Sequence, residues 1–235
     1  MSTSIPIRSA MQQAIAAAIG ACEAVLPAKD SGGEDAQELT HPISPRLSEA
    51  FALACQVHQN RARRGTNVPY LVHLLAVVAL VGESGGSEDE MIAAMLHDTL
   101  MEGDESGLLT GIQARFGEVV AETIRFCTDH ALGEEKAPWL ERKQAYLSRL
   151  IQAPLPSLRV VCADKMHNAQ SISRELKLSG PGAFERFKGD RDGTLWYYRS
   201  LARLFGALVQ DEPSLDPGFR AMIRELRETV AGLEG

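Results

Sequence analysis

The sequence lacks any run of about 18 consecutive apolar residues, the length that a membrane-spanning helix requires. Cysteine is scarce: the 235 residues contain four cysteines, none of them in a C-x-x-C pair. These cysteines are far apart and each falls in an apolar helical pattern, which predicts buried free thiols in a reducing compartment rather than disulfides. They are Cys22, Cys55, Cys127 and Cys162.

Positive charge is also in short supply, with 24 basic against 31 acidic residues and a formal net charge of −7. This balance argues against general binding to nucleic acid or to a membrane surface. The hydrophobic content of 45% is ample for the core of a globular protein. We therefore expect a cytoplasmic globular protein, and the sequence is compatible with a homo-oligomer.

Alternating patterns typical of β-strands are almost absent, and the sequence has no internal repeat. Apolar residues instead recur at helical spacing, which predicts an all-α protein of about eight helices. Ser87 and Glu90 are spaced as a capping box at the start of one helix. Ser157 follows two prolines and is predicted to cap a helix over 157–178.

A polar stretch with glycine and proline, residues 27–45, reads as a linker. Before it, residues 1–26 predict an amphipathic helix rather than a cleaved signal peptide, because the alanine-rich apolar part is interrupted and carries little positive charge. The main domain is expected over 46–210. Residues 211–235 are expected to form a C-terminal helix packed on that domain.

Four polar residues interrupt three otherwise apolar helical segments: His73, His97, Asp98 and Asp164. A lone histidine on an apolar helix is more often a core residue with a hydrogen-bond partner, and a His-Asp dipeptide arises easily by chance. Two carboxylates in a core, however, are costly unless a cation or hydrogen-bond donors compensate them. Two imidazoles and two carboxylates suit one divalent ion, so the set predicts a metal site.

Three segments occur in the order PYLVH, AAMLHD and CADKMHN, and this order resembles the HD-domain metal-dependent phosphohydrolases. Three further segments make the resemblance more specific: RRGTNVPYLVHLLAVVALV, ARFGEVVAETI and ERKQAYL. They are similar to the hydrolase domain of the RelA/SpoT-type alarmone enzymes and to the small stand-alone alarmone hydrolases. The similarity covers about residues 46–205.

The resemblance implies an HD-domain helical bundle that removes the 3′-pyrophosphate from guanosine 3′,5′-bis(diphosphate). The four ligands would hold manganese. Arg63 and Arg64 would lie near the nucleotide, Lys143 would contact a phosphate, and Asn168 would contact the nucleoside. The residues alone agree in part: the RARR cluster offers guanidinium groups that suit phosphate oxygens, although a solvated helix end is an equal reading.

One departure from the family pattern concerns the base. The alarmone hydrolases continue as H-D-x-x-E-D, and that Glu-Asp pair handles the attacking water. Here HDTLME places Met101 at the Glu position and Glu102 at the Asp position. Methionine cannot transfer protons, so Glu102 is the candidate base and Asp104 the second candidate.

Two other functions remain open at this stage. One keeps the fold and metal but hydrolyses another phosphomonoester, such as a deoxynucleotide or a dinucleotide 2′-phosphate. The other is a sensor that binds an alarmone without hydrolysing it.

The remaining histidines and aromatic residues have less specific readings. His41, His58 and His130 lie in polar sequence and are expected at the surface. His167 is expected either to support the metal site or to be structural. The aromatic run Trp196, Tyr197 and Tyr198 could line a base pocket, but aromatic residues in a helix are more often core.

Overall fold

The structure is a computed structural model that describes residues 44–100, 105–133, 135–185 and 187–234. This part of the chain contains no strand, and its one isolated bridge pairs Ala62 with Pro69. The all-α prediction is therefore confirmed. No helix in these ranges is both long and apolar enough to cross a membrane.

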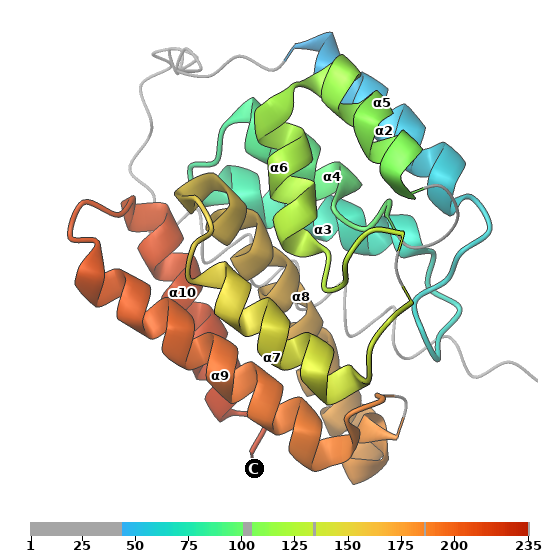
Figure 1. The fold of residues 1–235 in the computed structure, drawn as a ribbon. Coiled ribbons are helices and arrows are strands. Elements are labelled where there is room, and N and C mark those ends of the chain that lie inside the picture. Colours follow the sequence, from blue (N-terminus) through green and yellow to red (C-terminus); the bar gives the residue numbers. More distant parts are fainter. Residues whose placement is uncertain (1–43, 101–104, 134, 186, 235) are drawn as a thin grey trace, which may run out of the picture. The chain divides into compact units, whose positions relative to one another are not determined.

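The described chain folds into nine α-helices and one short 3₁₀ helix (Figure 1). In order they are α2 (Pro45–His58), α3 (Tyr70–Glu83), α4 (Glu88–Leu96), α5 (Glu105–Phe116), α6 (Glu118–Cys127), α7 (Trp139–Leu150), α8 (Leu155–Ser179), η1 (Gly180–Phe184), α9 (Asp190–Asp211) and α10 (Pro217–Ala231).

Helix α8 is the centre of the domain, because it packs against α3, α4, α6, α9 and α10. Ten of its side chains are buried, and they come from its first eighteen residues. The predicted metal ligand Asp164 lies within this buried part. Any polar group there needs a hydrogen-bond or ionic partner to offset the cost of its burial.

Two helix starts show how local sequence fixes these elements. Ser87 and Glu90 form the predicted capping box at the start of α4: the Ser87 hydroxyl accepts from the Glu90 N–H and the Glu90 carboxylate from the Ser87 N–H. The Ser157 prediction is wrong, since α8 begins at Leu155 after Pro154. Pro156 therefore lies in the first turn of α8, where a proline is tolerated because its missing N–H needs no partner. Ser157 is buried instead and shares a hydrogen bond with the Thr123 hydroxyl.

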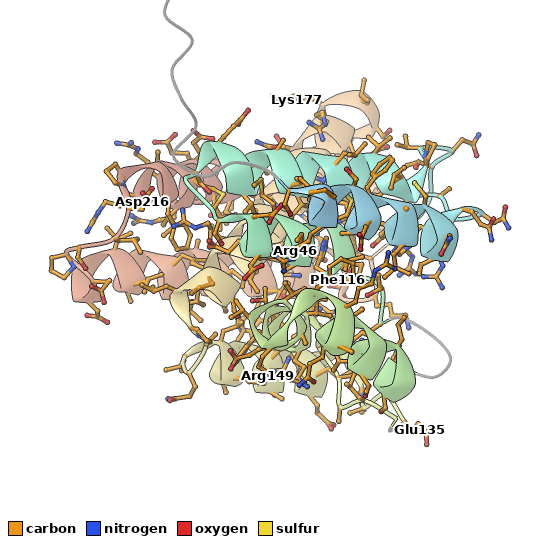
Figure 2. The ribbon with its side chains drawn as sticks, turned by 90° about the horizontal axis from the view of Figure 1, so that it is seen from above. Arg46, Phe116, Glu135, Arg149, Lys177 and Asp216 are labelled. Atoms are coloured by element: carbon orange, nitrogen blue, oxygen red, sulfur yellow. The ribbon has the colours of Figure 1, made fainter. Side chains whose placement is uncertain are left out.

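Arg46 joins α2 to two other helices. Its guanidinium donates to the Phe116 carbonyl at the end of α5 and pairs with Glu88 and Asp89 at the start of α4. Figure 2 labels Arg46 and Phe116 at this junction. These contacts hold α4, and with it the residues that follow α4, in a fixed position.

The described cysteines are free thiols, as predicted: Cys162 is buried, and Cys55 and Cys127 are partly buried. Cys22 lies outside the described residues, as do the predicted helix at 1–26 and most of the predicted linker at 27–45. In the C-terminal region, α10 packs against α8 and α9.

Candidate metal centre

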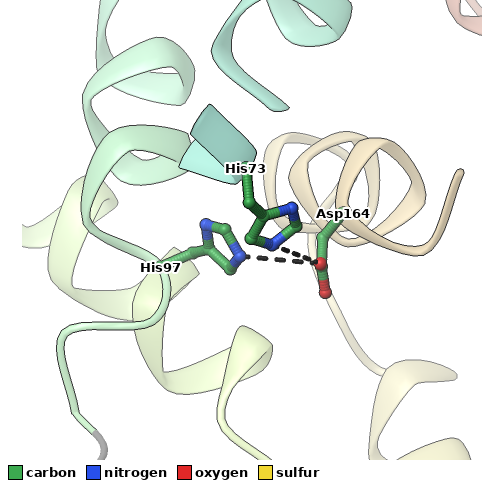
Figure 3. A group of neighbouring side chains, drawn as sticks. All are labelled: His73, His97 and Asp164. Atoms are coloured by element: carbon green, nitrogen blue, oxygen red, sulfur yellow. Dashed lines mark ion pairs between the residues drawn. The ribbon is translucent and has the colours of Figure 1, made fainter. Parts of the chain in front are cut away.

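Three helices bring the predicted ligands together. His73 lies on α3, His97 directly follows α4, and Asp164 lies on α8; all three are buried (Figure 3). One nitrogen or oxygen atom from each of these three lies within 4.8 Å of the others. Asp98 joins them, with Oδ2 3.2 Å from His97 Nε2 and 3.7 Å from His73 Nε2. These four residues are called the His-Asp cluster below.

The proton positions on the two imidazoles follow from their outer neighbours. His97 Nδ1 lies 2.7 Å from the Ala94 carbonyl oxygen, which can only accept, so Nδ1 carries a proton. His73 Nδ1 lies 2.7 Å from His167 Nδ1, and one of these two nitrogens must donate. Both Nε2 atoms therefore point into the cluster, and neither has a hydrogen-bond partner among the described residues.

Both carboxylates are held by further side chains. The Tyr70 hydroxyl donates to Asp98 Oδ2 at 2.5 Å. Lys165 donates to Asp164 Oδ2 at 2.6 Å, and the Asn168 amide donates to Asp164 Oδ1 at 2.5 Å. Such outer contacts fix the orientation of metal ligands and tune their affinity. Tyr70 was missed from sequence, although it lies three residues before His73 and therefore on the same helix face.

The pKa values of the cluster are shifted by the close contact between its imidazoles and carboxylates. Burial opposes a charge on His97, yet the neighbouring Asp98 and Asp164 carboxylates raise the His97 pKa to about 10. Against burial, His97 lowers the pKa of Asp98 well below its usual range, and Lys165 does the same for Asp164. Burial, followed by the charge of His73, lowers the pKa of His167 to about 4, so this ring is a neutral partner.

These observations fit a divalent ion. Two buried imidazole nitrogens without partners face two carboxylate oxygens, and a cation between them would satisfy all four atoms at once. A mixed imidazole and carboxylate set suits several divalent ions, manganese among them. Separate core histidines, the alternative that the sequence left open, would not explain why both Nε2 atoms lie without a hydrogen-bond partner beside two carboxylates.

A cavity of about 670 Å³ opens beside the cluster, and His73, Tyr70 and Lys165 are part of its wall. Among the described residues that line it, seven are basic and only Glu175 is acidic. This is a strong local excess of positive charge in an acidic protein, and it suits a ligand with several phosphates. The basic residues are Arg63, Arg64, Arg142, Lys143, Lys165, Arg174 and Lys188.

The four predicted substrate contacts all line this cavity: Arg63, Arg64, Lys143 and Asn168. Arg63 donates to Asn168 Oδ1 at 2.7 Å, so both ends of the Asn168 amide are engaged, one by Arg63 and one by Asp164. Lys143 donates to Asp129 and lies 4.7 Å from the centroid of the Tyr197 ring. Their contacts with a nucleotide stay predictions.

Other sequence predictions meet different outcomes. Met101, Glu102 and Asp104 lie outside the described residues, as does His41. Tyr197 and Tyr198 are buried in the core and also line the cavity, so both of the roles considered from sequence apply to them. Trp196 packs against the core.

Two histidines expected at the surface are largely covered: His58 is buried and His130 is half-buried. His58 is 3% exposed, because its ring stacks on Tyr70 at 5.0 Å between centroids. The His130 side chain is 7% exposed, and its Nε2 lies 3.0 Å from Glu105 Oε1. Both predictions were wrong for the same reason: residues distant in sequence cover these rings, and polar sequence neighbours do not reveal that cover.

Replacement of Asn168 by alanine is expected to weaken metal affinity about ten-fold, because it removes a donor that orients Asp164. Titration of metal-stripped protein with Mn²⁺ by calorimetry measures this directly. Ser171→Ala, one turn further along α8, is the matched control and should leave the affinity unchanged. Equal affinity of Asn168→Ala and wild type would show that the hydrogen bond to Asp164 does not support the site.

A family model described as "HD domain" matches residues 50–194, more than half of the chain. A guanosine-3′,5′-bis(diphosphate) 3′-pyrophosphohydrolase from Vibrio cholerae is 27% identical over 88% of this chain and 29% of its own length. The bifunctional (p)ppGpp synthase/hydrolase SpoT from Escherichia coli is 26% identical over 81% of this chain and 26% of its own. The chain thus spans less than a third of these curated relatives.

A solved structure supports the fold independently. It comes from a study described as "A metazoan ortholog of SpoT hydrolyzes ppGpp and plays a role in starvation responses", with a TM-score of 0.60 and 20% identity. The alignment covers 81% of this chain and 97% of that one. The resemblance read from the sequence motifs is therefore confirmed, and the chain belongs to the HD domain family.

Proposed function

We propose that this protein is a metal-dependent phosphohydrolase that removes the 3′-pyrophosphate from guanosine 3′,5′-bis(diphosphate). The observation that carries the proposal is the His-Asp cluster opening into a cavity with seven basic side chains. The names of the relatives from Vibrio cholerae and Escherichia coli support the choice of substrate.

The His-Asp cluster would hold the divalent ion, for which manganese is the first candidate. When bound, such an ion lowers the pKa of a coordinated water and polarises a phosphoryl group. Tyr70 and Lys165 hold the Asp98 and Asp164 carboxylates in place. His167 shares a proton with His73 and so fixes the orientation of that ring.

Substrate binding would fall to the basic side chains of the cavity. Arg64 has no carboxylate partner among the described residues, so its guanidinium is available to a phosphate. Lys143 is shared with Asp129, which also pairs with Arg142. Their charges neutralise phosphate oxygens and orient the scissile group towards the cluster. Glu102 remains the base proposed from sequence.

A nucleotide panel tests this proposal. Purified protein with Mn²⁺ is assayed with guanosine 3′,5′-bis(diphosphate), GDP, a deoxynucleoside monophosphate and a dinucleotide 2′-phosphate. The proposal predicts the highest kcat/KM for the first, with release of pyrophosphate. Release of orthophosphate from one of the others at a higher rate would favour the phosphomonoesterase instead.

Arg64→Ala is expected to raise KM about ten-fold, since a hydrogen bond to a charged group is worth about 1.5–3 kcal/mol, and to leave metal affinity unchanged. Arg63→Ala should raise KM and also weaken metal binding, because Arg63 holds Asn168 and Asn168 holds Asp164. Arg224→Ala, an exposed position on α10, is the control. An unchanged KM in both cavity variants would show that these arginines do not bind substrate.

A second candidate is a nucleotide-binding sensor, favoured by Met101 at the position of a catalytic carboxylate. This candidate predicts tight binding of the same nucleotide with no turnover in the presence of Mn²⁺. Equilibrium binding measured beside the panel separates the two.

A further inference from the structure

The cavity follows one face of helix α8. The lining residues Lys165, Asn168, Ser171, Arg174 and Leu178 recur at three- and four-residue spacing, as neighbours on a helix face do. Arg174 comes ten residues after Asp164, which corresponds to about 15 Å along the helix axis. This wall of the cavity therefore runs along α8 from beside the His-Asp cluster past Arg174 to Leu178.

The charges at the two ends differ in how they are compensated. Near the cluster, Lys165 pairs with Asp164, and Lys143 and Arg142 share Asp129. These inner cations are thus partly neutralised by the protein itself. An arriving phosphate would share them with those carboxylates.

Arg174, at the outer end, and Lys188, elsewhere on the cavity wall, are exposed and have no carboxylate within ion-pair distance in the described part of the chain. The only hydrogen bond of the Arg174 guanidinium there goes to the Ser171 hydroxyl at 3.2 Å. Glu175 is the one acid on this wall, and its carboxylate accepts from the Ser179 hydroxyl. Arg174 and Lys188 are called the outer cation pair below.

We infer that the outer cation pair binds the phosphate group at the end of the nucleotide opposite the scissile one. Because about 15 Å of helix separates Arg174 from Asp164, Arg174 and the cluster cannot hold the same phosphate. The same cavity wall carries the apolar groups Phe187, Trp139 and Tyr197, which suit the sugar and base. The inference rests on the proposed function and makes the 5′-diphosphate the group that Arg174 and Lys188 recognise.

Two substrates that differ only at the 5′ end isolate this contact. Guanosine 3′,5′-bis(diphosphate) carries the 5′ phosphates, and guanosine 3′-diphosphate has a free 5′ hydroxyl. Arg174→Ala and Lys188→Ala should each raise KM for the first substrate about ten-fold and together by more, as expected for loss of a charge-assisted contact. KM for the second substrate should stay within about two-fold, because it has no group for the pair to bind.

Lys177→Ala is the control, since Lys177 is exposed near the same end of α8 but does not line the cavity (Figure 2). It should change KM for neither substrate. An equal loss for both substrates in the cavity variants would overturn the inference, because it would indicate a general field or a structural effect. No loss for either substrate would overturn it as well.

Binding to metal-free protein keeps the inference testable if turnover is absent. In EDTA, the affinity ratio between the two nucleotides should be large for wild type and close to one for the Arg174→Ala, Lys188→Ala double variant. If the wild-type protein binds both nucleotides equally, the assignment of Arg174 and Lys188 to the 5′-diphosphate is contradicted, while the proposed function is not. A wild type that shows the ratio but no hydrolysis with Mn²⁺ contradicts only the proposed function.

Discussion

Asp98→Asn is expected to lose its metal and at least about 10³-fold of kcat/KM, because metal catalysis supplies several kcal/mol of transition-state stabilisation. The substitution keeps the shape and the acceptor for the Tyr70 hydroxyl, but it removes one of two negative charges that face the imidazole nitrogens. Elemental analysis should find about one ion per chain in wild type and almost none in the variant.

Thermal unfolding gives a second readout of the same loss. An ion present at about 100 times its Kd stabilises the folded state by about 2.7 kcal/mol, so chelation should lower the Tm of wild type by several degrees. The Tm of Asp98→Asn should not respond to chelation. Asp216→Asn is the matched control: Asp216 caps α10, and asparagine caps equally well. Equal metal content in Asp98→Asn and Asp216→Asn would remove Asp98 from the site.

The second large effect concerns the catalytic base, which is predicted from sequence because residues 101–104 lie outside the described structure. Glu102→Gln should lower kcat by about 10²–10⁴-fold, the range for a positioned acid or base, without loss of metal. Met101→Glu restores the carboxylate that the family pattern places there and should raise kcat about ten-fold or more. Met101→Gln is the control, because glutamine has the shape of glutamate but no acidic group.

The outcomes of these variants are separable. A Met101→Glu protein that loses activity would mean that the methionine belongs to a differently organised site. A Glu102→Gln protein as active as wild type would place the base elsewhere, with Asp104 as the next residue to replace. If every version is inactive but binds nucleotide, the sensor is the better account.

The gathering of His73, His97 and Asp164 was predictable from sequence because these residues break apolar helical patterns. His73, His97 and Asp164 stand where the pattern asks for apolar side chains, and burial without a partner is too costly to be accidental in three helices. That these three helices pack together could be expected without detailed geometry, because each apolar segment must be buried in the same core. The all-α fold was predictable from a different signal, the apolar residues at helical spacing and the near absence of alternating patterns.

The residues that orient the ligands were harder to see. Lys165 lies next to Asp164 and reads as an ordinary charged residue, yet it is one of the two donors to the Asp164 carboxylate, with Asn168. Tyr70 and His58 cover each other, and His130 meets Glu105 across 25 residues of sequence. Such pairings depend on how helices cross, and local patterns do not contain that information.

Asn168 illustrates the difference between a role and a position. The family pattern assigned it to the nucleoside, whereas here its amide joins Arg63 to Asp164. A sequence motif identifies which residue matters in a site. The hydrogen bonds identify what that side chain holds before any substrate arrives.

Product analysis of one reaction tests the central claim most directly. Purified protein loaded with Mn²⁺ is incubated with guanosine 3′,5′-bis(diphosphate), and the products are separated by ion exchange and quantified. The account predicts GDP and pyrophosphate in equal amounts from wild type and neither from Asp98→Asn. Orthophosphate in place of pyrophosphate, or equal turnover by the two proteins, would contradict it.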